Sequence, residues 1–167
     1  MIREEVVEAK EELSERVVSI TRVAKVHKGG KHLRFRALVA IGDGRGQVGI
    51  GIGKANEVAQ AIQKAGTVAR KGMITVALAG TTIPHEIRAK YGAADVLLKP
   101  ARPGSGVISG GSMRAVIEAA GIKDVLAKSL GTSNPTNVVK ATMVALSQLR
   151  EPEKVLAERR AGLTGRG

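Results

Sequence analysis

Hydrophobic and polar positions alternate along three consecutive segments in the first half of the chain. The period of two over residues 17–26, 33–41 and 48–53 predicts three strands, because successive side chains of a strand point to opposite faces. The intervening turns have the sequences KGGK at 28–31 and DGRG at 43–46, and glycine in such turns permits a positive φ angle. We therefore expect an antiparallel three-stranded sheet.

The third predicted strand has an unusual composition. Its apolar face consists of Val48, Ile50 and Ile52, and the alternate positions 49, 51 and 53 are all glycine. Repeated glycine in a strand usually marks a place where another group approaches the backbone closely. Two hypotheses remain open from the residues alone. In the first, the strand places the N-terminus of the following helix, with Lys54 beside it, where it can bind a phosphate. In the second, the strand packs directly against a helix.

A helix is predicted from Ala55 onward, because apolar residues recur with a period of 3.6. Its expected buried stripe consists of Val58, Ala61, Ile62, Ala65, Val68 and Ala69. At the start of the chain, the segment before the first predicted strand is charged up to about Glu15 and is either a short helix or a tail. The sequence thus predicts an amino-terminal extension over 1–15 and a first domain over 16–72.

In the second half, strands are predicted over 73–79, 83–91 and 94–98, followed by a glycine-rich loop over 101–111. Ser112 is the expected N-cap of a helix over 113–120 that ends at Gly121. Residues 125–130 form a short strand or a turn. A last helix starts at Asn134-Pro135 and ends at Glu151-Pro152. We expect a second domain over 73–150, an α+β class for the whole chain, and a charged tail over 151–167.

Composition narrows the function. The 167 residues carry a formal net charge of +12 and contain no cysteine, which excludes disulfide scaffolds, thiol catalysis and cysteine-ligated zinc. No apolar run approaches the roughly 18–20 residues of a membrane span, so we expect no membrane partner. The aromatic residues are Phe35 and Tyr91 alone, which argues against binding single strands by base stacking.

The positive charge is concentrated. Residues 22–72 contain eleven basic and two acidic side chains, a net charge of +9 in under a third of the chain. Ordinary solvated surfaces mix the two signs, so this asymmetry favours a binding face for structured RNA or duplex nucleic acid over a scattered solubilising charge. Duplex RNA is recognised mainly by its shape and its phosphates.

Enzymatic signals are weak. The loop at 103–112 precedes a helix, as phosphate-binding loops do, but it lacks the spacing of a Walker lysine. The GRGQVG sequence at 44–49 is followed by a strand, whereas a dinucleotide fingerprint requires a helix there. The acids between 73 and 150 and the three histidines have no catalytic or metal-ligand spacing. A small phosphotransferase is therefore the weaker alternative, and we expect no catalytic residues, no cofactor and no metal.

Several blocks of the sequence carry a resemblance. Residues 42–58 (GDGRGQVGIGIGKANEV) are similar to the signature of the family of bacterial small ribosomal subunit protein five. Further similar blocks are RVAKV at 22–26 with KGG at 28–30, TIPHE at 82–86, KPA at 99–101, RAV at 114–116, DVLAKSLG at 124–131 and NPTNVV at 134–139. Together they span about residues 14–150. Ala59, Ser105 and Ser109 depart from the usual proline, threonine and alanine, and none of these changes removes a charge.

The resemblance implies a double-stranded-RNA-binding-like domain, with a three-stranded antiparallel sheet and a helix, and then a βαββα-type two-layer sandwich. It implies a cytoplasmic, ribosomal protein that binds small-subunit ribosomal RNA, contacts small-subunit proteins four and eight, and lies on the path of messenger RNA into the subunit. Roles in subunit assembly and decoding accuracy follow from the same resemblance. A free-standing binder of structured RNA is the alternative.

The candidate sites combine the charge pattern with this resemblance. The residues expected to contact RNA are the basic side chains and close-approach glycines of the first domain: Arg22, Lys25, Lys28, Gly29, Gly30, Lys31, Arg34, Arg36, Arg45, Gly51, Gly53, Lys54, Lys64, Arg70 and Lys71. The residues expected to face a protein partner are Arg102, Gly104, Ser105, Gly106 and Arg114.

Overall fold

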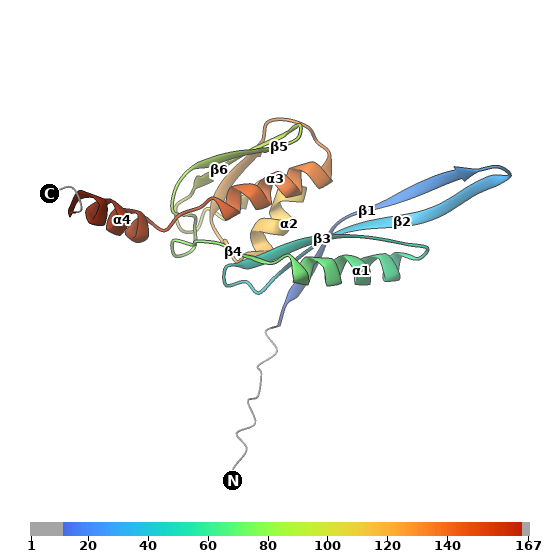
Figure 1. Ribbon diagram of the computed structural model, residues 1–167, viewed down its shortest axis with the longest axis horizontal. Helices are drawn as coiled ribbons and strands as arrows, with labels where there is room; N and C mark the ends of the chain where they lie inside the picture. Colours follow the sequence, from blue (N-terminus) through green and yellow to red (C-terminus); the bar gives the residue numbers. More distant parts are fainter. Residues whose placement is uncertain (1–11, 165–167) are drawn as a thin grey trace, which may run out of the picture.

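Two four-stranded sheets frame the protein in the computed structural model, which describes residues 12–164 (Figure 1). The first sheet has the order β1-β2-β3-β4 and consists of β1 (Ser14–His27), β2 (Gly30–Gly42), β3 (Gln47–Ala55) and β4 (Ile74–Thr75). The second has the order β5-β6-β8-β7 and consists of β5 (Ile87–Tyr91), β6 (Ala94–Pro100), β7 (Val107–Ile108) and β8 (Val125–Ser129). All strand pairs are antiparallel except β7 with β8.

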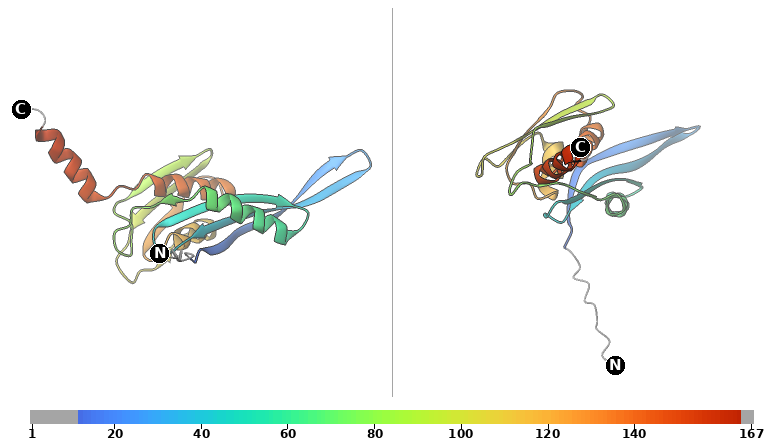
Figure 2. Two further views of the ribbon diagram at one scale, coloured as in Figure 1. Left: turned by 60° about the horizontal axis from the view of Figure 1, so that its bottom comes forward. Right: turned by 60° about the vertical axis from the view of Figure 1, so that its left-hand side comes forward.

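Helices occupy both faces of the first sheet. Helix α1 (Val58–Lys71) covers its outer face, and α2 (Gly111–Ala119) and α3 (Pro135–Ser147) lie between the two sheets (Figures 1 and 2). Helix α2 packs on β1, β2 and β3, and α3 packs on β5 and β6. Helix α4 (Pro152–Thr164) extends away from this body. The layers are therefore helix, sheet, helices and sheet.

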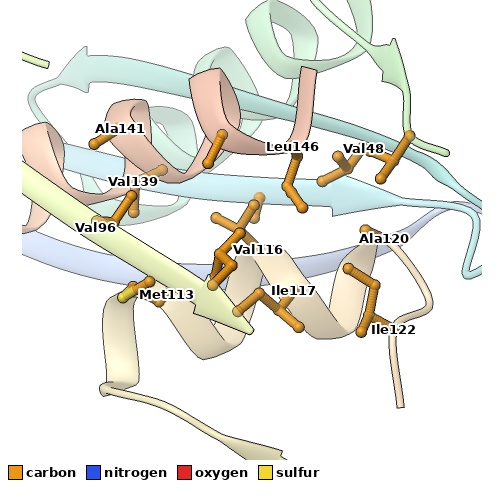
Figure 3. Packing of buried hydrophobic residues seen from close by; sticks show 14 of the residues in the cluster. Val48, Val96, Met113, Val116, Ile117, Ala120, Ile122, Val139, Ala141 and Leu146 are labelled. Atoms are coloured by element: carbon orange, nitrogen blue, oxygen red, sulfur yellow. The ribbon is translucent and has the colours of Figure 1, made fainter. Parts of the chain in front are cut away.

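The larger hydrophobic core lies between the sheets and joins the two halves of the chain. Val48 from the first sheet, Val96 from the second, and Val116 and Leu146 from the intervening helices are all fully buried in it (Figure 3). A smaller core lies on the other face of the first sheet, beneath α1. The two predicted domains thus share the larger core.

Strand β2 separates these two cores. Ala37, Val39 and Ile41 point to the α1 side, and Leu38 and Ala40 point to the larger core. A strand that is covered on both faces has a continuous apolar run in place of strict alternation. The interior end of β2 is therefore fixed from both sides.

The glycines of β3 allow α1 to lie directly on the strand. A Cβ atom would come within 2.3 Å of the Ala69 carbonyl oxygen at Gly49, 2.0 Å of that of Ala65 at Gly51, and 2.2 Å of that of Ala61 at Gly53. Four residues of a helix rise about 6 Å along its axis, and two residues of a strand span about 6.6 Å. Every second residue of β3 therefore meets every fourth residue of α1.

The expected role of two glycines in RNA contact is corrected by this packing. Gly51 and Gly53 are buried beneath α1, so the group that approaches their backbone is the helix and no RNA can reach that face. The packing hypothesis is the correct one for the glycine strand. The apolar face of β3 is core-directed, as predicted.

Several predicted boundaries also change. Helix α1 begins at Val58, since Ala55 still pairs with Phe35 in the sheet, and Val68 is 50% exposed instead of buried. The strand predicted over 73–79 shrinks to β4, which pairs with β3 and so belongs to the first sheet. The strand predicted over 83–91 begins only at Ile87.

The two N-caps predicted in the second half have different outcomes. Asn134 caps α3 as predicted, because its side chain accepts a hydrogen bond from the Thr136 backbone N–H at 3.3 Å. By contrast, α2 begins at Gly111 with Gly110 as its N-cap, so Ser112 lies inside the first turn. The predicted tail contains α4, which begins at Pro152. Of the predicted amino-terminal extension, residues 1–11 lie outside the described residues.

The α+β class is confirmed, with two sheets and their helices. The element order of the second half is β5-β6-β7-α2-β8-α3, which replaces the βαββα order expected from the resemblance. Among residues 12–164, no helix is long and apolar enough to cross a membrane.

The packing of α1 on β3 predicts a strong effect of one methyl group. Gly51→Ala should lower the free energy of unfolding by about 1–3 kcal/mol or more, because the new Cβ would overlap the Ala65 carbonyl and force the helix away. Thermal and urea denaturation measure the change. Gly111→Ala is the matched control, since a Cβ there meets no atom within 4 Å. Equal stability of the two variants would contradict this account of the glycine strand.

Candidate nucleic-acid interface

The β1–β2 hairpin projects from the body as a two-stranded arm (Figures 1 and 2). Its ladder runs from Ser14↔Gly42 to His27↔Gly30, whereas β3 accompanies β2 only up to Phe35↔Ala55. Residues 23–27 and 30–34 therefore lie beyond the third strand. At the tip, Gly29 has a φ of +97°, which glycine adopts without strain.

One face of this arm carries a row of basic and histidine side chains. Cross-strand partners share a face, and the register pairs Lys25 with His32, Val23 with Arg34, and Arg36 with Lys54. We call the six titratable side chains of this side the cationic face; they are Lys25, His27, His32, Arg34, Arg36 and Lys54. Residues two apart on a strand are about 6.6 Å apart, so the charges form a regular row.

The opposite face of the arm is largely apolar. Ala24 pairs with Leu33, and Val26, which is 73% exposed, pairs with Lys31. Nearer the body, the Arg22 guanidinium lies 5.7 Å from the centre of the Phe35 ring, and Phe35 packs against the core beneath α1. Stacking on an aromatic ring positions a guanidinium without neutralising it. The arm thus has two chemically different sides.

Most of the expected RNA-binding cations have no acidic partner in the part of the chain that the structure describes. The ion pairs of residues 12–164 are Arg16–Glu118, Arg70–Glu15, Arg88–Asp95, Arg114–Glu118 and Lys154–Glu151. Arg70 is the one member of the expected set among them, with Nη2 3.0 Å from the Glu15 carboxylate. The Lys64 ammonium lies 3.5 Å from the Lys54 carbonyl oxygen. The cations of the arm therefore remain available to an external anion.

The expected RNA-binding residues do not form one patch. Arg45 lies in the β2–β3 turn, at the other end of the 13-residue strand β2 from the tip, about 40 Å away at 3.3 Å per residue. Arg70 and Lys71 lie at that same end, because the Ala69 carbonyl of α1 lies over Gly49. The set divides into the arm with Lys54 and Lys64, and a second group of Arg45, Arg70 and Lys71.

The glycines at the tip differ from those of β3. A Cβ at Gly29 or Gly30 would meet no atom within 4 Å, and both residues are exposed. Lys28 and Lys31 flank them and are also exposed. The tip is therefore open to close approach by a partner, which the face of Gly51 and Gly53 is not.

The glycine-rich loop of the second half is held from inside by one buried carboxylate. Asp124 Oδ1 accepts hydrogen bonds from the backbone N–H groups of Gly104, at 3.1 Å, and Gly106, at 2.9 Å. The pKa of Asp124 is lowered, first by a hydrogen bond from the Thr81 side chain and then by the N–H groups of Gly106 and Gly104. Since Asp124 is only 4% exposed, its charge depends on these donors.

This arrangement is unfavourable for the phosphotransferase alternative. A phosphate loop presents its backbone N–H groups to the ligand, and here two of them are directed to Asp124. Within residues 12–164, no three metal-ligating His, Cys, Asp or Glu side chains gather. The loop is instead tied to the body by this carboxylate.

The structure brings the residues expected to face a protein partner together. Arg102, Gly104 and Ser105 are exposed on the loop, and Gly106 is half-buried. Arg114 of α2 donates a hydrogen bond to the Val107 carbonyl at 2.8 Å, so its side chain is tied to the end of the same loop.

Sequence reasoning missed a neighbouring cleft. A hollow of about 460 Å³ lies beside this loop, and its lining includes Arg16, Arg114, Glu118 and Lys123. Glu118 pairs with both Arg16 and Arg114. Arg16 is 102 positions from Glu118, and no local pattern indicates a pairing at that separation.

Comparison with known proteins identifies the family. Residues 13–77 match the family model of the ribosomal protein S5 N-terminal domain, and residues 89–160 match that of the ribosomal protein S5 C-terminal domain. The chain belongs to the ribosomal protein S5 family. Two relatives, both small ribosomal subunit protein uS5 from strains of Dehalococcoides mccartyi, are 55% identical to it over 152 residues, which cover 91% of this chain and 88% of each relative.

Membership of the S5 family confirms the resemblance found in the sequence. The family is one of structural, non-enzymatic ribosomal proteins, so the chain is a ribosomal protein and not an enzyme. The expected ribosomal, cytoplasmic location is confirmed by the same membership. The individual RNA-binding and partner-facing residues, and the expected domain boundaries, stay predictions.

The support of the glycine loop by Asp124 predicts a pH-dependent stability. Because the folded-state pKa of this carboxyl lies below its unfolded value, its ionisation stabilises the fold above the unfolded value, near 3.9, and this contribution is lost as the pH falls through the folded pKa. Asp124→Asn should therefore be less stable than the parent at pH 7, and the difference should shrink toward pH 3. Urea denaturation of both proteins across this range measures it.

The parent and the variant share Asp95, whose pKa is also lowered, first by its hydrogen bond with Arg88. The difference between the two proteins at each pH therefore isolates Asp124. A stability difference that stays constant from pH 7 to pH 3 would contradict the assignment.

Proposed function

We propose that this S5-family chain is a structural constituent of the small ribosomal subunit that binds small-subunit ribosomal RNA through its β1–β2 arm. The observation that carries the proposal is the cationic face of that arm. It extends beyond the third strand and has no acidic partner among residues 12–164.

The chemistry of the arm suits a folded RNA. Lysine and arginine contacts to phosphates position a protein on a helix without reading its sequence. A two-stranded ribbon with a side-chain-free tip at Gly29 and Gly30 can enter a groove or junction more deeply than a broad surface can. The near absence of exposed aromatic side chains favours recognition of shape over stacking on unpaired bases.

The finer assignments are part of the same proposal. The loop at 102–106, with Arg114 tied to its end, supports a role as a contact for small-subunit protein four, and through that contact in decoding accuracy. Contact with protein eight, a place on the path of messenger RNA and a part in subunit assembly follow from the family resemblance. The second group of cations, Arg45, Arg70 and Lys71, lies far enough from the arm to bind another RNA segment.

The RNA that accompanies the protein in cells tests the proposal directly. The tagged chain is isolated at about 150 mM salt and its RNA is sequenced. Enrichment of one region of small-subunit ribosomal RNA is the expected result. Heterogeneous duplex RNA would instead favour a free-standing binder of structured RNA, and the absence of RNA would overturn the proposal.

The affinity for small-subunit ribosomal RNA should depend steeply on salt. If about 6–10 phosphates are contacted, the association constant should fall roughly 10³–10⁵-fold between 50 and 200 mM salt, because each contact releases condensed counterions. Filter binding at several salt concentrations measures the slope. A slope near zero would show that phosphate contacts do not hold the complex.

Loss of two lysines from the arm should weaken binding without unfolding the protein. Lys25 and Lys28 are exposed and lie in no ion pair of the described residues. Their joint replacement by alanine should reduce the salt slope by about 2 and change the stability by no more than about 0.5 kcal/mol per site. Lys99→Ala with Lys128→Ala, in the second half, is the matched control, because both lysines are exposed and lie in no ion pair of the described residues. A large drop in melting temperature would show that the arm lysines are structural.

A further inference from the structure

Two histidines lie side by side at the outer end of the cationic face. The ring centres of His27 and His32 are 5.0 Å apart, with an angle of 74° between the ring planes. In the ladder, His32 is paired with Lys25 and His27 with Gly30, so the two rings are diagonal neighbours on one face. Both residues are exposed.

The histidine pair is part of a hollow. Lys25, His27, His32, Leu33 and Arg34 line it from the arm, and Asn56 closes it from the segment that follows β3. Its volume is about 440 Å³. The lining thus combines two permanent cations, two groups that become cations by protonation, and an amide.

We propose that this hollow binds a backbone phosphate of RNA, and that protonation of the two imidazoles strengthens the binding. The inference rests on the proposed function, since it takes RNA as the ligand. It adds a specific phosphate site and a dependence on pH, neither of which the net charge of the arm implies.

The imidazoles of His27 and His32 form no hydrogen bonds with other described residues. Neither ring of the pair has a hydrogen bond to the protein within residues 12–164, and their one ring contact is with each other. His85 is different, because its Nε2 accepts a hydrogen bond from the Arg150 backbone N–H at 3.2 Å and its Nδ1 lies 2.9 Å from the Glu86 carbonyl oxygen. Ring nitrogens without protein partners can donate to a phosphate once both are protonated.

The surrounding charges couple protonation to the anion. Lys25 and Arg34 line the same hollow, so the imidazoles share it with two permanent cations. Glu57 follows Asn56 in the chain, but its carboxylate accepts a hydrogen bond from Gln60 Nε2 at 3.5 Å. The diester phosphate of an RNA backbone carries one negative charge, and in the hollow it would offset the repulsion among these groups. Protonation of the imidazoles and binding of the phosphate therefore favour each other.

The pH dependence of affinity tests the site. Binding of a bacterial small-subunit ribosomal RNA transcript is measured from pH 8.0 to pH 5.5 at constant ionic strength. We expect the affinity to rise about tenfold or more, because protonation adds charge-assisted hydrogen bonds to the phosphate. The double variant His27→Asn with His32→Asn should lose most of this rise, so that its affinity at pH 5.5 stays close to its own affinity at pH 8.0. His85→Asn is the matched control and should keep the full rise.

The histidine resonances give a second, direct measurement. The Cε1–H signals of the three histidines are titrated by NMR with and without an RNA duplex. RNA should change the chemical shifts of the His27 and His32 signals and leave those of His85 unchanged. Because the two residues are exposed, the asparagine variant should keep the parent's melting temperature, which is checked in parallel.

The outcomes separate this inference from the proposed function. If the parent binds ribosomal RNA with a steep salt slope but no pH dependence, or if the double variant keeps that dependence, the phosphate site is wrong and the proposed function stands. If the parent binds no ribosomal RNA at any pH, the proposed function itself fails. A pH-dependent gain for polyglutamate larger than that for RNA would assign the hollow to carboxylates and overturn the inference.

Discussion

The direct contact between the backbone of β3 and the backbone of α1 is the constraint on which the first sheet depends. With glycine at 49, 51 and 53, the helix carbonyls of Ala61, Ala65 and Ala69 rest on the strand itself. This places α1 so close that short alanine side chains suffice to fill the core beneath it. Because the other face of the sheet is covered by α2 and α3, β2 is clamped from both sides over 37–42. The arm is the continuation of this clamped strand, so its direction is set by the body.

The body and the arm also differ in how their charges are paired. The acids of the body are used to neutralise cations of the body, as in Arg16–Glu118 and Arg88–Asp95, or to hold backbone, as Asp124 does. The arm contains no acid between Arg16 and Gly42. Its cations between these residues repel one another and form no ion pair among the described residues, which is unfavourable for an isolated domain and favourable for a surface whose partner is a polyanion. The inner end of β2 is thus packed in the body, and its outer end carries the unpaired charges of the arm.

The sequence predicted the elements whose signals are local. Alternation located β1, β2 and β3, and the Asn134-Pro135 pair located the start of α3. The errors arose where tertiary contacts decide. Ala55 fits a helical pattern but remains in the sheet because Phe35 pairs with it, and the strand after α1 is cut to Ile74 and Thr75 because only the edge of β3 is free to receive it. The glycine strand was correctly recognised as a place of close approach, but a period of two cannot say whether a helix or a phosphate makes that approach.

The candidate site shows the same limit at a larger scale. Charge counting identified the cations of 22–72 but could not show that β2 keeps Arg45 about 40 Å from the tip. Pairing across the ladder, in contrast, follows from the hairpin register, and that register brings His27 and His32 together although five positions separate them in the chain. Spacing along the sequence does not mark these histidines as a pair. Their contact, and the presence of Lys25 and Arg34 around them, become visible only when the two strands are aligned. A hairpin thus places basic residues from two strands in one row on one face. The position of that row, more than the total charge of the protein, determines which phosphates its side chains can contact.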